Sequence, residues 1–175
     1  MPDRREARAG PPARQQLYTA EERRRRDDTV WTLVQGVLAP AQFLVFLVSL
    51  AFVLRFMTTG EGYGLATASI VVKTAVLYTI MVTGAIWEKV VFGRWLFAPA
   101  FFWEDVFSFV VIALHTAYLY ALLVELSPRT QMVIALCAYA AYVVNAAQFL
   151  LKLRAARLQA GADDAGMASP QELAA

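Results

Sequence analysis

Long stretches without charged residues divide the chain into four apolar segments. Three stretches contain no Asp, Glu, Lys or Arg: residues 29–54, 106–124 and 130–151. The fourth, residues 64–87, is interrupted only by Lys73. A helix needs about 20 apolar residues to cross the hydrocarbon core of a bilayer. The pattern therefore predicts four transmembrane helices, over about residues 30–55, 64–87, 101–124 and 130–152.

The composition agrees with a membrane protein that has polar ends. Hydrophobic residues make up 59% of the 175 positions and charged residues 17%, respectively above and below the proportions in soluble domains. We expect an all-α integral membrane protein, with a four-transmembrane-helix bundle over residues 18–158 and disordered polar tails at residues 1–17 and 159–175. The sequence TAEE, with Thr19 as cap and Glu22 as its partner, has the pattern of a capping box and predicts a short polar helix before the first span. The first apolar run lacks a small-residue cleavage pattern, so a removed signal peptide is not expected.

Basic residues gather on one side of the predicted membrane. Of the 15 Lys and Arg outside the spans, 13 fall before the first span, between the second and third, or after the fourth. An excess of basic residues marks the cytoplasmic side, so both termini are expected in the cytoplasm. The RRRR run at residues 23–26 is flanked by acidic residues, and the net charge is only +2. We interpret the run as a topology signal and do not expect a nucleic-acid partner.

Polar residues within the spans recur at helical spacing. In the first span Gln35, Gln42 and Ser49 are seven residues apart and share one face, which should point into the bundle. In the fourth span a slanting stripe recurs every three residues: Tyr139, Tyr142, Asn145 and Gln148. Interhelical hydrogen bonding is the ordinary explanation of both patterns, and a polar binding site is the alternative.

Three acidic residues lie at the predicted cytoplasmic boundary. Glu88 closes the second span, and Glu104 and Asp105 open the third. Interfacial ion pairs with Lys89 and Arg94 would explain them without any function. Gln35, Asn145 and Gln148 are expected at a similar depth, so a compact polar cluster near the cytoplasmic face is the other interpretation. The neighbouring Phe101, Phe102 and Trp103 could equally form an interfacial aromatic belt.

The only histidine, His115, lies deeper in the third span. It follows Glu104 by eleven residues, which places it on nearly the same face but about 16 Å along the axis. A histidine in a membrane can ligate a metal, relay protons or hydrogen-bond a neighbouring helix, and the sequence leaves these open. Without a second histidine, a bis-histidine haem is excluded.

Five stretches of the chain carry a resemblance to a known family: WTLVQGVLAPAQFLVFLVSL, IMVTGAIWEKVVFG, LFAPAFFWEDVFSF, ALHTAYL and AAYVVNAAQFLLKLR. They are similar to the 3-vinyl bacteriochlorophyllide hydratase family of bacteriochlorophyll biosynthesis, over about residues 18–157. The resemblance implies a hydro-lyase that adds water across the C3-vinyl group of chlorophyllide a, or a related precursor, to give the 3-(1-hydroxyethyl) derivative. It also implies a bacterial photosynthetic inner membrane. No catalytic residue is carried over from the family.

Hydration of a vinyl group requires protonation of its terminal carbon, an oriented water and a site for the flat pigment. A carboxylic acid kept protonated at a low-dielectric boundary suits the first task. We favour Glu104 as the general acid, with Asp105 or Glu88 orienting the water or accepting its proton.

The remaining candidates bind the substrate. Phe101, Phe102 and Trp103 could pack on the macrocycle, and Arg94 could bind its carboxylate. The amides that could contact the substrate or its water are Gln35, Asn145 and Gln148. No cofactor is expected, because the magnesium arrives with the substrate, and His115 is a candidate axial ligand to that magnesium.

The expected partners are the chlorophyllide or bacteriochlorophyllide substrate, water, membrane lipid and other pigment-biosynthesis enzymes. A non-catalytic pigment-binding or assembly factor is the alternative, in which His115 ligates magnesium and the acids only set topology. A transporter is disfavoured, because the sequence shows no inverted halves or paired broken helices.

Overall fold

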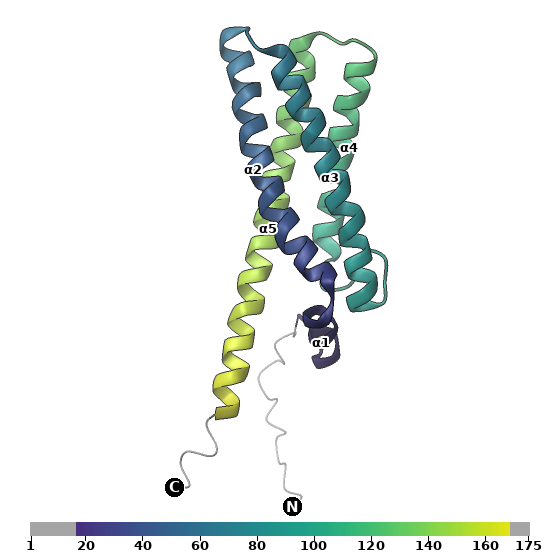
Figure 1. The fold of residues 1–175 in the computed structure, drawn as a ribbon, viewed down its shortest axis with the longest axis vertical. Coiled ribbons are helices and arrows are strands. Elements are labelled where there is room, and N and C mark those ends of the chain that lie inside the picture. Colours follow the sequence, from purple (N-terminus) through teal and green to yellow (C-terminus); the bar gives the residue numbers. More distant parts are fainter. Residues whose placement is uncertain (1–16, 169–175) are drawn as a thin grey trace, which may run out of the picture.

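The structure is a computed structural model that describes the backbone of residues 17–168 and the side chains of residues 17–158 and 161. The tail predicted at residues 1–17 lies outside this range except for residue 17. The described part of the chain is all α-helical. Figure 1 shows five helices, α1 (Ala20–Asp28), α2 (Val30–Thr59), α3 (Tyr63–Phe92), α4 (Phe102–Leu123) and α5 (Pro128–Ala168).

Four of the five helices are long and apolar enough to cross a membrane. These are α2, α3, α4 and the Pro128–Leu158 part of α5. The four predicted spans are therefore confirmed as helices of suitable length and composition. Helices α2, α3 and α5 extend past their predicted spans, because helical backbone continues into polar flanks that the hydropathy pattern excludes, whereas α4 is one residue shorter at each end.

Local sequence signals set the helix ends. The capping box is confirmed, since the Thr19 hydroxyl accepts a hydrogen bond from the Glu22 backbone N–H and the Glu22 carboxylate accepts from the Thr19 backbone N–H. Gly60 and Gly93 end α2 and α3 in the left-handed conformation, with φ of 76° at both. Helix α2 runs unbroken past Pro40.

The last helix differs from the sequence prediction. We expect a tail from residue 159, but α5 continues to Ala168. The segment is rich in alanine, and the first proline after Pro128 is Pro170. Alanine is the best helix former, and a helix ends at or before the residue that precedes a proline.

The four long helices form two hairpins. Helix α2 packs mainly on α3, and α4 packs mainly on α5, while the contacts between the hairpins are fewer. Helix α1 lies against α3 and, together with the loop between α3 and α4, marks one end of the helix bundle, beyond which α5 extends (Figure 1). We call this the α1 end.

Polar side chains inside the bundle face its interior as predicted. Gln42 and Ser49 of α2, and Tyr139, Tyr142 and Asn145 of α5, are all buried. In the half away from the α1 end these groups bond across helices, for example Ser49 Oγ to the Tyr139 hydroxyl at 2.5 Å. The inward face predicted for α2 is therefore confirmed at Gln42 and Ser49, and three of the four stripe residues of α5 are buried as well.

Candidate active site

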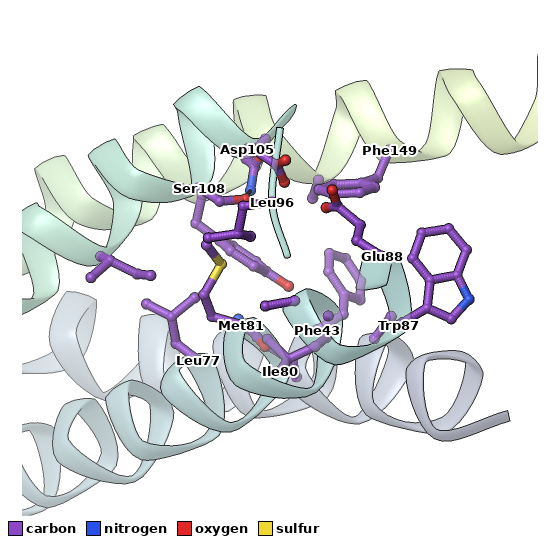
Figure 2. Close-up of a pocket in the computed structure, with 18 of the residues that line it drawn as sticks. Phe43, Leu77, Ile80, Met81, Trp87, Glu88, Leu96, Asp105, Ser108 and Phe149 are labelled. Atoms are coloured by element: carbon purple, nitrogen blue, oxygen red, sulfur yellow. Dashed lines mark hydrogen bonds between the residues drawn. The ribbon is translucent and has the colours of Figure 1, made fainter. Parts of the chain in front are cut away.

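A cavity lies between the two hairpins, towards the α1 end. Its volume is about 530 Å³, within the range of about 300 to 1,000 Å³ typical of small-molecule sites. Its walls come from all four long helices and the loop between α3 and α4, and they are mostly apolar (Figure 2). The large apolar side chains on the wall include Phe43, Leu77, Ile80, Met81, Trp87, Leu96, Ile112 and Phe149.

Two acidic side chains share this wall, Glu88 near the end of α3 and Asp105 in the first turn of α4. They are 5% and 4% exposed. Figure 2 shows their carboxyl groups turned towards each other, and the two side chains are within hydrogen-bonding reach. A hydrogen bond between two carboxyl groups requires a proton on one of them. The structure thus brings two buried carboxyl groups close together on the wall of an apolar cavity.

The loop between α3 and α4 supplies backbone donors to both acids. The Ala98 N–H donates to Glu88 Oε2 at 3.1 Å, and the Phe97 N–H donates to Asp105 Oδ2 at 2.6 Å. Phe97 has a φ of 58°, in the left-handed region that a bulky residue rarely adopts. Its ring stacks on Phe109 with centroids 5.6 Å apart. This packing and the bond to Asp105 hold the strained loop against the two acids.

Glu104 faces away from the cavity. Its Oε2 lies 2.6 Å from the Lys152 Nζ of α5, and Lys152 also donates to the Ala100 carbonyl. Successive helical residues point about 100° apart, so Glu104 and Asp105 reach different partners. Lys152 is one of the basic residues after the fourth predicted span, which served above only to orient the chain in the membrane. Its position at the same membrane level as Glu104 is the signal that could have identified the ion pair.

The predicted amides separate into three environments. Asn145 lines the cavity, where its Nδ2 donates to Ser108 Oγ at 2.9 Å and its Oδ1 has no partner among the described residues. Gln148 also has a buried Oε1 without a described partner, but it is not on the cavity wall. Gln35 donates from Nε2 to Thr83 Oγ1 of α3 at 2.8 Å and lies behind the wall. The cavity thus brings together only part of the expected cluster.

The predicted substrate-binding aromatics also separate. Phe101 is 7% exposed and packs edge-on against Trp87, with ring centroids 5.5 Å apart, whereas Phe102 and Trp103 are 45% and 66% exposed. Phe101 therefore supports the cavity from behind, and Phe102 and Trp103 face outward. Arg94 is exposed in the loop after α3. Phe43, Trp87 and Phe149 line the wall instead, although the sequence pattern did not single them out.

His115 lies outside the cavity wall in the buried core. Its Nδ1 is 2.8 Å from the Val111 carbonyl, which can only accept, so Nδ1 carries the proton. Its Nε2 then accepts from Lys73 Nζ at 3.3 Å. Both ring nitrogens are thus engaged within the protein. Magnesium ligation by His115 stays a prediction that this geometry does not support.

Comparisons with known proteins bear on the resemblance described above. The family model described as 2-vinyl bacteriochlorophyllide hydratase matches residues 18–155. A protein of that name from Rhodobacter capsulatus is 70% identical over 155 residues, covering 89% of this chain and 91% of the relative. Another from Cereibacter sphaeroides is 72% identical over 142 residues, covering 81% and 89%. No solved structure matches the chain. The chain therefore belongs to the 2-vinyl bacteriochlorophyllide hydratase family, as the resemblance predicted.

Proposed function

We propose that this chain hydrates the vinyl group of a chlorophyllide or bacteriochlorophyllide and that the Glu88–Asp105 pair supplies the proton. The hydratase activity, in bacteriochlorophyll biosynthesis, follows from membership of the family. The carboxyl pair on the cavity wall is the observation that carries the assignment of the acid. The reacting group is the vinyl substituent written as C3 above, which the family name counts as position 2.

The cavity suits a flat apolar pigment. Its wall is built from aliphatic and aromatic side chains with only a few polar groups, as expected for a ligand held by burial and oriented by a small number of contacts. Trp87 and Phe149 offer ring surfaces next to the two acids. The carboxylate of the pigment would remain at the α1 end, where the exposed Arg94 is available to bind it.

The reaction proceeds in two steps, protonation of the vinyl group and capture of water. The shared carboxyl proton is transferred to the terminal vinyl carbon, whose π electrons form the new C–H bond. Positive charge develops at the carbon attached to the macrocycle, and the conjugated ring spreads it. A water oxygen then forms the C–O bond and gives its extra proton to the carboxylate, which restores the acid. The sum is the addition of one water to the vinyl group.

Asp105 and Glu88 fit the acid better than Glu104, which the sequence analysis favours. Glu104 is within 2.6 Å of the Lys152 ammonium and is not on the cavity wall. Its carboxyl group is already bonded to Lys152 and does not face the cavity, so it is poorly placed to donate a proton to a ligand there. In this proposal Glu104 instead joins α4 to α5 and holds the α1 end together.

The proposal also includes the membrane in which the chain lies and the side on which its termini are found. In this proposal both termini lie on the cytoplasmic side of a bacterial photosynthetic membrane, which the four candidate spans and the excess of basic residues at the α1 end support. The cavity would then open in the cytoplasmic half of the bilayer. Partners in that membrane are lipid and other enzymes that handle the same pigments.

The test is a hydration assay with chlorophyllide a and the protein purified in detergent. We expect Asp105→Asn and Glu88→Gln to lower the rate by about 100-fold or more, the usual contribution of a general acid, whereas Glu104→Gln keeps most activity per folded molecule. The product is followed as a mass increase of one water. Full activity in folded Asp105→Asn and Glu88→Gln would refute the acid assignment. Bound but unaltered pigment with the unsubstituted protein would favour the non-catalytic alternative.

A further inference from the structure

Gln42, on the inner face of α2, has a side-chain oxygen without a hydrogen-bond partner among the described residues, whereas Gln35 and Ser49 on the same face are bonded to α3. Gln35, Gln42 and Ser49 are spaced by seven residues on that face. Gln35 bonds to Thr83 of α3 at 2.8 Å, and Ser49 bonds to Ser69 of α3 at 2.7 Å. Gln42 lies between them, is only 2% exposed, and its buried Oε1 has no hydrogen-bond partner among the described residues.

Interhelical hydrogen bonding therefore explains the outer two residues but not Gln42. A buried polar atom without a partner is costly, most of all inside a membrane, where water does not compensate it. Gln42 lines the cavity. An apolar residue would fill the same place at no such cost, so the unpartnered amide points to a polar ligand within the cavity.

A second unpartnered amide oxygen is on the same wall. Asn145 of α5 uses its Nδ2 to bond to Ser108, which leaves Oδ1 as a buried acceptor without a described partner. Two residues that line the cavity, one from each hairpin, thus carry a buried amide oxygen without a described partner, and the Glu88–Asp105 pair lines the same cavity. A ligand that satisfies both amides must offer two hydrogen-bond donors.

We infer that Gln42 and Asn145 together bind and orient the water that attacks the vinyl-derived cation. This inference rests on the proposed hydratase function. A water that donates one hydrogen to Gln42 Oε1 and the other to Asn145 Oδ1 keeps its lone pairs for the reacting carbon. The amides do not take up the proton released after the C–O bond forms. That proton goes to the carboxylate of the acid pair, so Gln42 acts as a positioning residue.

Deuterium exchange separates water capture from proton transfer. In D₂O the acid adds a deuteron to the terminal vinyl carbon, and the cation either captures water or loses a proton and returns to the vinyl pigment. Loss of the oriented water favours the return, which leaves deuterium in the recovered vinyl group. For Gln42→Leu we expect hydration to fall on the order of 10- to 100-fold, the cost of misplacing a reactant, while vinyl exchange persists and the ratio of exchange to hydration rises.

Three variants make the result specific. Gln42→Met repeats the test with an unbranched side chain in case Gln42→Leu does not fold. Gln131→Leu is the matched control, because Gln131 is also 2% exposed but bonds to Tyr63 at 2.7 Å and is not on the cavity wall. It should lower thermal stability and leave the exchange-to-hydration ratio unchanged. Asn145→Leu should raise the ratio as Gln42→Leu does.

Two outcomes would overturn the inference. An unchanged ratio in folded Gln42→Leu and Gln42→Met would show that Gln42 does not orient the water. Parallel loss of hydration and exchange would show that Gln42 acts before water capture, for example in pigment binding. Asp105→Asn should abolish both reactions. If exchange persists in Asp105→Asn, the acid assignment fails, while the result for Gln42 still stands.

Discussion

Two adjacent acids at the start of α4 have different surroundings. Asp105 faces the cavity and Glu88, whereas Glu104 pairs with Lys152 of α5. Both are almost fully buried, at 4% and 6% exposed, so burial alone does not distinguish them. The charge opposite each one does. Glu104 faces the Lys152 ammonium, whereas Asp105 faces the carboxyl group of Glu88.

We predict that the Glu104–Lys152 pair stabilises the α1 end. Lys152→Ala leaves the Glu104 carboxylate buried without its cation and should lower the free energy of unfolding by roughly 1 to 3 kcal/mol, between the values for exposed and fully buried pairs. Thermal unfolding in detergent measures the effect. The double variant Glu104→Gln with Lys152→Met should recover part of the loss, because no buried charge is left unpaired. A double variant less stable than Lys152→Ala would contradict this account.

At the scale of elements, the loop between α3 and α4 prepares the site. It carries no catalytic side chain in our proposal, but its backbone donates to both acids through Phe97 and Ala98. The donated bonds require Phe97 to keep its φ of 58°. Phe97 is therefore important for its backbone conformation as well as for its ring.

This role of the loop predicts opposite results for two substitutions at Phe97. Phe97→Pro removes the N–H and forbids a positive φ, so the hydration rate should fall by about 10-fold or more as Asp105 loses a donor worth about 1.5 to 3 kcal/mol. Phe97→Asn keeps the N–H and tolerates the left-handed region, so it should retain most activity despite losing the ring stack. Rates per folded molecule, with helix content from circular dichroism, provide the comparison. Equal losses in the two variants would assign the role to the ring.

At the scale of the whole molecule, the two-hairpin arrangement creates the cavity. Each hairpin packs tightly within itself, and the looser contact between them leaves room at the α1 end. Farther from that end, the bundle is closed by buried groups such as Lys73, His115 and Tyr139. The molecule therefore combines a closed half with a half that encloses the cavity in which we propose that the pigment binds.

Filling the cavity should block the pigment without unfolding the bundle. Ala85 of α3 lines the cavity, so Ala85→Phe should weaken pigment binding by about 10-fold or more, a loss of at least 1.4 kcal/mol. Ala75→Phe is the control, since Ala75 is on the same helix but exposed on the outside of the bundle. Quenching of tryptophan fluorescence by chlorophyllide measures binding. Equal affinity in the two variants would place the pigment elsewhere.

The sequence alone determined the four long helices and several of their ends, although not the extension of α5 to Ala168. These features depend on local patterns: apolar length for the spans, Thr19 and Glu22 for the cap, and glycine for the ends of α2 and α3. It also determined that Gln42 faces inward, because helical periodicity sets that face.

Only the tertiary structure decided which partner each polar group meets. The rotation of α4 against α5 brings Glu104 to Lys152 and turns Asp105 to the cavity, and the path of the loop brings Phe97 and Ala98 to the acids. Because the hairpins are separated at the cavity, Gln42 Oε1 has no hydrogen-bond partner among the described residues, whereas Gln35 and Ser49 bond to α3. Such contacts join residues that are distant in the chain, and side-chain spacing along one helix does not specify them.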